Sequence, residues 1–262
     1  MCYSVSLNII KFDYFNYTWW HMKGFIDIHS HILPGVDDGS DSYGTSIKML
    51  KCAADNGIAG IILTPHNKPG HRNRDFSRTE VKFKELKDLV SHENINIDLY
   101  IGNELYYRNG LLEEIRDGMA GTMAGSHYVL VEFSPLESYD YIRNGLYSLL
   151  MGGYSPIAAH VERYQNVCAK GVRIDELIEM GCYIQINAGS IMGSFGAKTR
   201  RIARKMLKQH QVHFVATDAH DLGKRAPYLS DCADYISKKY GGDYARKLLC
   251  ENPLCVIRDE EI

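Results

Sequence analysis

Short apolar runs rich in β-branched residues alternate with longer segments of helical period along most of this 262-residue chain. In the first helical segment, Ile47, Leu50 and Ala54 recur at spacings of three and four, and Gly57 stands where a helix end is expected. Seven such strand–helix units predict a parallel sheet that is buried on both faces. The predicted strands are 25–29, 59–64, 97–102, 128–133, 155–160, 182–187 and 212–217, and the predicted helices are 44–56, 79–92, 141–151, 172–180, 199–210, 228–240 and 243–250.

No Pro/Gly/Ser-rich linker divides residues 22–262, so we expect them to form one domain. A closed or nearly closed α/β barrel accommodates seven strand–helix units more readily than an open doubly wound sheet, which is the alternative. Residues 1–21 are broken by polar side chains, so they lack the apolar core of a signal peptide and are too polar to span a bilayer. Met22 precedes the first strand, so an untranslated segment and a disordered N-terminal extension both stay open for residues 1–21.

The composition excludes several classes of function. A formal net charge of −2 disfavours binding through bulk charge, so we expect no nucleic-acid partner. The seven cysteines are dispersed without a C-x-x-C pair, which is typical of reduced thiols in a cytoplasmic protein. No arginine stands six positions after a cysteine, so the sequence lacks the C-x5-R loop of a cysteine phosphatase.

Metal-competent side chains stand at the carboxyl ends of six of the seven predicted strands. The carboxyl ends of barrel strands meet at one face, where α/β barrels place their chemistry. Imidazole nitrogens and carboxylate oxygens together form the ligand set of zinc, manganese or iron clusters. In chain order these strand ends carry His29, His31, Asp37 and Asp38, then His66, Glu104, Glu132, then His160 with Glu162 and Arg163, and finally Asp218 and His220.

The H-x-H spacing of His29 and His31 places both imidazoles on one side of an extended chain, because side chains alternate with a period of two. Asp218 and His220 repeat this spacing. A single histidine at a strand end is usually a satisfied polar residue, but coincidence poorly explains six such placements at one end. Solvated or packed roles are expected for the remaining histidines, which are His21, His71, His92, His127, His210 and His213.

Several runs of the sequence resemble the PHP (polymerase and histidinol phosphatase) superfamily. They are FIDIHSHILPGVDDG, GNELYY, VEFS, AHVERY and TDAHDLG followed by KRAPYL, and they cover nearly everything from Met22 onward. HSH and DAH specify the superfamily alone. VDDG, GNELYY and HVERY resemble most closely the tyrosine-protein phosphatases of bacterial capsule and exopolysaccharide clusters. The resemblance implies a single-domain, distorted (β/α)7 barrel of PHP type.

The resemblance also implies three divalent ions, often manganese, with iron, zinc or magnesium as alternatives. The assignment of ligands to ions stays open, as does the choice between Asp37 and Asp38, although the family's usual aspartate is the second of the pair. By motif position the ligands are His29, His31, Glu104 and Asp218 for the first ion, Glu104, Glu132 and His160 for the second, and Asp38, His66 and His220 for the third.

Arg163 and Arg225 are the candidate catalytic and substrate-binding residues. A guanidinium fork matches two phosphate oxygens and stays charged, so these arginines are expected to clamp the phosphate. A salt bridge between Arg163 and Glu162 is the alternative for the first arginine. Three tyrosines near ligand positions are expected either to line a pocket for an aromatic ring or to serve as ordinary packing: Tyr106, Tyr107 and Tyr164.

The resemblance implies a metal-dependent protein-tyrosine phosphatase. Its expected partner is a tyrosine-phosphorylated protein, namely a bacterial tyrosine kinase that regulates capsule or exopolysaccharide synthesis. A histidinol phosphatase or another small-molecule phosphomonoesterase would keep the chemistry and change the substrate. An inactive metal-binding regulatory protein is the alternative from another class, and a PHP nuclease is disfavoured because the sequence shows no basic channel.

Overall fold

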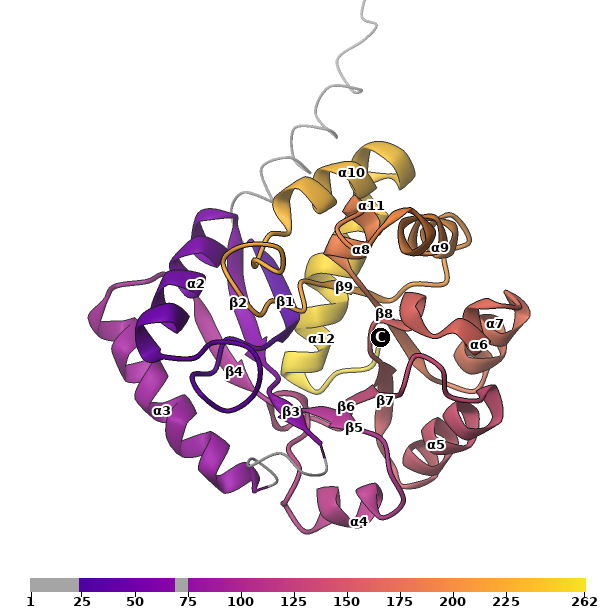
Figure 1. Cartoon of the computed structure of the whole chain (residues 1–262), viewed down its shortest axis with the longest axis horizontal. Coiled ribbons are helices and arrows are strands. Elements are labelled where there is room, and N and C mark those ends of the chain that lie inside the picture. Colours follow the sequence, from indigo (N-terminus) through magenta and orange to yellow (C-terminus); the bar gives the residue numbers. More distant parts are fainter. Residues whose placement is uncertain (1–23, 69–74) are drawn as a thin grey trace, which may run out of the picture.

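The computed structural model describes residues 24–68 and 75–262 and has an α/β fold built on a curled parallel sheet (Figure 1). The expectations for residues 1–21, including His21, and for His71 fall outside the described residues. Neighbouring strands run parallel in the orders β1-β2-β4 and β3-β5-β6-β7-β8-β9. The strands are β1 (Phe25–Ser30), β2 (Ile58–Leu63), β3 (His66–Asn67), β4 (Asp98–Ile101), β5 (Glu104–Tyr106), β6 (Tyr128–Glu132), β7 (Ser155–Ala158), β8 (Tyr183–Asn187) and β9 (Phe214–Ala216).

Two of the predicted strands continue further than expected, after an interruption. The strand predicted at 59–64 ends as β2, and β3 begins directly after Pro65, which has no N–H to donate to a sheet. The strand predicted at 97–102 likewise forms as β4, and β5 begins after Gly102 and Asn103. Because β2 pairs with β4 and β3 pairs with β5, the two interrupted strands stay side by side, and His66 lies opposite Glu104.

The predicted helices form with ends shifted by a few residues, and three of them begin at polar side chains that cap the first turn, namely Ser42, Asp75 and Ser138. Several elements of less than three turns were not predicted, because they are too short to show a helical period. The helices are α2 (Tyr43–Asp55), α3 (Phe76–His92), α4 (Leu111–Arg116), η1 (Met123–Gly125), α5 (Tyr139–Met151), η2 (Val161–Arg163), α6 (Gln165–Cys168), α7 (Val172–Glu179), α8 (Ala188–Met192), α9 (Ala197–Lys208), α10 (Ser230–Tyr240), α11 (Gly242–Arg246), η3 (Lys247–Glu251) and α12 (Asn252–Arg258).

The segment that follows β9 lies beside the end of β1. The backbone N–H of Asp218 donates to the carbonyl of His29, and the N–H of His31 donates to the carbonyl of Ala219, both at 2.8 Å. Buried Asp27 accepts hydrogen bonds from Thr217 N at 3.0 Å and from its hydroxyl at 2.5 Å. These bonds curl the sheet until its first and last strands meet, so side chains from both ends of the chain share one site.

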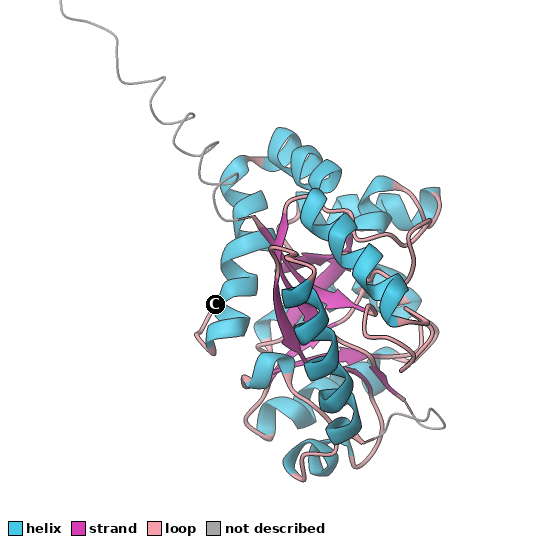
Figure 2. Ribbon diagram, turned by 90° about the vertical axis from the view of Figure 1, so that its left-hand side faces the viewer, coloured by secondary structure: helices cyan, strands magenta, loops and turns pink. Residues whose placement is uncertain are grey.

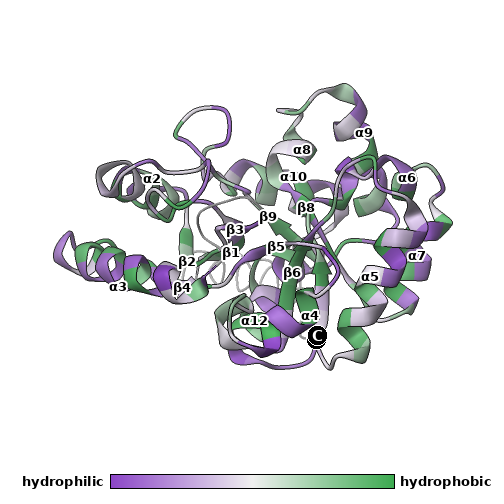
Figure 3. Ribbon diagram, turned by 60° about the horizontal axis from the view of Figure 1, so that its bottom comes forward, coloured by the Kyte–Doolittle hydropathy of each residue, from purple (hydrophilic) through white to green (hydrophobic). Residues whose placement is uncertain are grey.

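Two apolar clusters fill the space on either side of the sheet. The larger one lies between the strands and the surrounding helices, which Figure 2 shows packed outside the strands. The smaller one lies within the curl, where Ile28, Ile157 and Phe214 pack with Val256 of α12. Figure 3 shows the apolar strands at the centre and mixed polar and apolar helices around them. No described helix is both long and apolar enough to cross a membrane.

Candidate metal centre

The candidate ligands of the first predicted ion lie together at the carboxyl end of β1. His29 and His31 turn their Nε2 atoms toward each other at 3.2 Å. Glu104 approaches both rings, with Oε1 at 3.2 Å from His29 Nε2 and Oε2 at 3.3 Å from His31 Nε2. Asp218 Oδ1 lies 3.5 Å from each of the two Nε2 atoms. All four side chains are buried.

Glu104 also reaches the candidate ligands of the second ion. Its carboxylate lies 2.9 Å from His160 Nε2 and 2.8 Å from His66 Nδ1. Glu132 lies 3.6 Å from His160 and 3.8 Å from His66. Glu104 therefore stands at the centre of the cluster, where the resemblance expects a bridging carboxylate.

Asp38, His66 and His220 form a third group at the exposed side of the cluster. Asp38 Oδ1 lies 3.4 Å from His66 Nε2 and 3.5 Å from His220 Nε2. Together with His31, these residues bring one potential ligand atom each within 4.8 Å of one another. Two further groups meet the same criterion, namely His29, His31 and Glu104, and His66, Glu104 and Glu132. The structure thus brings all nine predicted ligands into one cluster.

Asp37 and Asp38 face different directions, which separates their roles. Asp37 accepts hydrogen bonds from His31 Nδ1 at 2.7 Å and from the backbone N–H of His66 at 3.0 Å. Its carboxylate thereby orients His31 and leaves the Nε2 atom of that ring directed into the cluster. The Asp38 side chain is 64% exposed and points toward His66 and His220. This geometry favours Asp38 as a metal ligand and Asp37 as the residue that orients His31.

The cluster concentrates negative charge, and its pKa values respond to that charge. Burial by itself would lower the pKa of His31, but Asp37 raises it to about 9. Burial would also lower the pKa of His66, but Asp38 and Glu104 raise it to about 11. Burial and the neighbouring charge of Glu104 raise the pKa of Glu132. The carboxylates therefore favour positive charge among them, whether from protonated histidines or from bound cations.

Two buried atoms of the cluster also point to bound cations. Glu132 Oε2 and His220 Nε2 are buried and make no hydrogen bond to the part of the chain that the structure describes. Unsatisfied buried polar atoms are costly unless another partner is present. Imidazole and carboxylate groups that converge on a common centre are the donor set of divalent transition metals. The residues present therefore fit a metal cluster.

A chain of buried amides on β8 connects two of the candidate ligands, and the sequence analysis missed it. Asn187 Nδ2 donates to Asp218 Oδ2 at 2.7 Å, so Asn187 Oδ1 is free to accept from Gln185 Nε2 at 2.8 Å. Gln185 Oε1 then accepts from the His160 N–H at 2.8 Å and lies 3.2 Å from His29 Nδ1. Since an amide oxygen can only accept, His29 Nδ1 is the donor in this contact, which leaves the Nε2 atom of the ring directed at the cluster.

Two of the candidate ligands have unusual backbone conformations. His160 has φ of 37° and Asp218 has φ of 54°, in the left-handed region that non-glycine residues seldom adopt. Each residue lies two positions after the end of a buried strand, β7 or β9, and carries a side chain of the cluster. Such strain is concentrated at functional sites, where the surrounding structure holds it in place.

The two predicted arginines converge on Asp218 from different segments. Arg225 Nη2 lies 2.7 Å from Asp218 Oδ1, and Arg163 Nη1 lies 3.7 Å from Asp218 Oδ2. Glu162, the alternative partner of Arg163, instead accepts from the N–H of Asn187 and from the hydroxyl of Ser190. Both guanidinium groups are partly exposed at the edge of the buried cluster, so they are accessible to a bound phosphate.

The remaining predicted residues take packing roles. Tyr164 is buried, and its hydroxyl accepts from the N–H of Phe133, while Tyr107 stacks on Phe133. Tyr106 lies under the ammonium group of Lys68. The other described histidines lie outside the cluster: His127 pairs with Asp259, His210 packs on Tyr244, His213 accepts from Ile184 N, and His92 ends α3.

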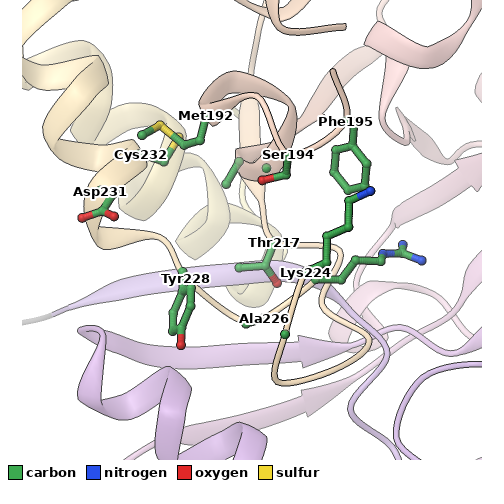
Figure 4. A pocket seen from close by; sticks show the side chains of 13 residues that line it. Met192, Ser194, Phe195, Thr217, Lys224, Ala226, Tyr228, Asp231 and Cys232 are labelled. Carbon is green, nitrogen blue, oxygen red and sulfur yellow. The ribbon is translucent and has the colours of Figure 1, made fainter. Parts of the chain in front are cut away.

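A cavity of about 360 Å³ lies beside Arg225. Its walls come from α8, the loop after α8, the segment around Arg225 and the start of α10 (Figure 4). Met192, Phe195 and Tyr228 give the walls an apolar character, and Lys224 extends along the Phe195 ring, 5.8 Å from its centroid.

Comparisons with known proteins match most of the sequence to one family. Residues 25–258 match the family described as "Capsular polysaccharide synthesis, CpsB/CapC". Tyrosine-protein phosphatase CpsB of Streptococcus pneumoniae is 36% identical over 242 residues, which cover 90% of this chain and 100% of that protein. Tyrosine-protein phosphatase YwqE of Bacillus subtilis is 28% identical over 237 residues, or 90% of this chain and 93% of that protein.

A solved structure shows the same fold. It comes from work on YwqE of Bacillus subtilis and CpsB of Streptococcus pneumoniae, described as unique metal-dependent tyrosine phosphatases, and superposes with a TM-score of 0.85 at 29% identity. The match covers 90% of this chain and 96% of that one. A phosphotriesterase homology protein from Escherichia coli has a TM-score of 0.56 at 13% identity, so it shares the fold alone.

Proposed function

The chain belongs to the CpsB/CapC family of capsular polysaccharide synthesis, and on that premise we propose that its metal centre hydrolyses phosphotyrosine on a protein-tyrosine kinase. The chain is a metal-dependent tyrosine phosphatase, as its relatives are named. The observation that carries the proposal is the buried cluster around Glu104 with two arginines at its edge.

Three of the described cysteines, Cys168, Cys182 and Cys250, are unsuited to act as an alternative nucleophile. Burial raises the pKa of the thiols of Cys168, Cys182 and Cys250 to about 12. These thiols stay protonated near neutral pH, and a protonated thiol is a poor nucleophile. The nucleophile for phosphate ester cleavage is therefore expected to be a water molecule held at the histidine–carboxylate cluster.

The proposed site residues divide the chemistry among themselves. Divalent ions held by the nine clustered ligands would lower the pKa of a coordinated water and neutralise charge on the phosphoryl group. Arg163 and Arg225 would hold the phosphoryl oxygens, where a fixed guanidinium charge stabilises the transition state. Asp218 holds both guanidinium groups close to the cluster before substrate binds. A tyrosine phenolate, with a pKa of about 10, is an undemanding leaving group.

Several finer assignments are part of the proposal. The ions are three in number and are manganese in the cell, and the ligands are divided among them as the resemblance implies. The curled sheet is a distorted seven-stranded (β/α) barrel within one domain over residues 22–262, with β2–β3 and β4–β5 each counted as one strand. The protein acts in the cytoplasm, which the free thiols of the described cysteines support.

The experiment that tests the proposal combines metal analysis with two substrates. The purified protein is assayed on a phosphotyrosine peptide and on histidinol phosphate, with and without added manganese. A His160→Ala variant is the control. We expect manganese-dependent phosphate release from the peptide that the variant loses. A preference for histidinol phosphate would overturn the proposed phosphotyrosine substrate. The absence of both bound metal and turnover would overturn the enzymatic function and leave a non-catalytic regulatory role.

A further inference from the structure

Helix α9 carries an unusual concentration of positive charge. Its sequence, AKTRRIARKMLK, contains six basic residues and no acidic one, although the whole chain has a formal net charge of −2. Lys198, Arg201, Lys205 and Lys208 are exposed and follow one another at spacings of three, four and three residues. These spacings place the four side chains on one face of the helix, which we call the basic face of α9.

The basic face has no ion-pair partner in the described part of the chain. None of its four side chains forms a salt bridge with the residues that the structure describes. Arg204, on another side of the helix, differs: its Nε donates to the carbonyl of Ile191, and its guanidinium group lies over the ring of Tyr235. Helix α3 also differs, because its lysines alternate with Glu80, Glu85 and Asp88. The charge of the basic face is therefore not needed to hold α9 in place.

The basic face begins at Lys198, close in sequence to residues that line the cavity beside Arg225. Helix α9 packs against η2, which carries Arg163, and against α8 (Figure 1). Phe195 lines the cavity beside Arg225 and stands three residues before Lys198. Lys224 lies on the same side of this cavity, over the Phe195 ring. A peptide whose phosphotyrosine reached the cluster could thus leave across the cavity and onto the basic face.

We propose that the basic face of α9 binds acidic side chains that flank the phosphotyrosine in the protein substrate; this inference rests on the proposed function. The four basic residues span about 15 Å of helix, which matches four or five residues of an extended peptide. Cationic side chains without internal partners complement aspartate and glutamate, and they raise the rate of encounter as well as the affinity. The adjoining cavity favours a peptide over a flat anionic membrane.

The test compares two phosphotyrosine peptides that differ only in their flanking residues, Asp and Glu in one and Asn and Gln in the other. A small aryl phosphate, p-nitrophenyl phosphate, reports on the metal centre alone. We expect kcat/KM of the native enzyme to be about tenfold higher for the acidic peptide, and this preference to shrink at high salt. We expect Lys198→Glu/Arg201→Glu to abolish the preference without changing turnover of the small substrate.

A matched double variant on α3, Lys84→Glu/Lys87→Glu, makes the same charge change on a balanced helix and should keep the preference. Lys198→Gln/Arg201→Gln gives a milder variant in case charge reversal impairs folding. Equal rates for both peptides with normal turnover of the small substrate would overturn the inference and leave the proposed function intact. An equal loss of the acidic-peptide preference in the α3 variant would also overturn the inference. Binding of the native enzyme to anionic vesicles, without a preference for the acidic peptide, would overturn it as well. Failure to hydrolyse the small substrate would count against the proposed function itself.

Discussion

The two ends of the parallel sheet differ in how their polar groups are arranged. The carboxyl end gathers buried histidines and carboxylates around Glu104, and two of the candidate ligands, His160 and Asp218, lie in the left-handed backbone region. The amino end is closed by α12 and the residues after it, where polar groups have partners: Tyr128 Oη donates to the Glu260 carbonyl, and Asn252 Nδ2 donates to the His213 carbonyl. Stability is therefore expected to reside at one end and chemistry at the other.

The largest effect should come from the centre of the carboxyl end. Glu104→Gln keeps the shape of the side chain but removes the charge that four histidine rings approach. We expect phosphatase activity to fall by at least about a thousandfold, together with metal content. Circular dichroism should show a folded protein, because the inner apolar cluster is unchanged. Normal metal content in an inactive variant would contradict the role of Glu104 as a ligand.

A substitution at the amino end should lower stability and leave turnover unchanged, which is the reverse of the effect expected for Glu104→Gln. Phe214 begins β9 and is fully buried in the inner cluster, so Phe214→Ala should lower the free energy of unfolding by about 3–5 kcal/mol. Turnover per folded molecule should stay close to that of the native enzyme at low temperature. Denaturant unfolding and kcat measured on the same sample check both statements. A large loss of kcat in the folded variant would break the proposed separation of the two ends.

Arg225 lies at the edge of the cluster at the carboxyl end, and its substitution tests whether this edge binds the phosphoryl group. We expect Arg225→Ala to lower kcat/KM about a hundredfold, because a fixed charge on the phosphoryl oxygens is lost. Metal content should not change, since the Arg225 side chain reaches the cluster through Asp218 Oδ1, and the hydrogen bond from the His220 N–H to the Arg225 backbone carbonyl is kept in the variant. Arg225→Lys should restore little, because an ammonium group cannot form the two-pronged contact. Loss of metal from the alanine variant would instead make Arg225 a structural support.

Gln185 contacts two of the candidate ligands from the side away from the cluster, so its substitution tests whether such contacts orient them. Its oxygen faces His29 Nδ1 and accepts from the N–H of His160, so Gln185→Leu leaves both donors without this acceptor. We expect metal affinity to fall about tenfold, which a chelator competition titration would measure. Gln185→Glu keeps an acceptor and should lose less. Unchanged metal affinity in the leucine variant would show that the β8 amides do not orient the ligands.

The sequence predicted which side chains lie together in the cluster because each of them stands in or just after the end of an apolar predicted strand. Strand ends are visible as the points where apolar runs stop, and parallel strands bring those points together whatever the length of the helices between them. Gln185 and Asn187 were missed because amides within a strand carry no metal-ligand signal of their own. The direction of Asp37 depends on His31 and on the backbone of His66, which are six and 29 residues away in sequence. Contacts of this kind follow from packing rather than from local pattern.

The smallest predicted effect concerns pH and the amino end. Burial lowers the pKa of His213 to about 4, and its Nδ1 accepts from the N–H of Ile184 at 3.1 Å. A histidine that is neutral when folded but titrates near 6.5 when unfolded stabilises the fold above that pH, and this contribution is lost as the pH falls from about 6.5 toward 4. Between pH 7 and 5 the free energy of unfolding of the metal-free protein should fall by on the order of 1–2 kcal/mol through this residue.

In His213→Asn, which keeps an acceptor but does not titrate, the stability difference from the native protein should shrink as the pH falls. A difference that stays constant from pH 7 to 5, measured by denaturant unfolding, would show that His213 does not set the acid sensitivity of this end.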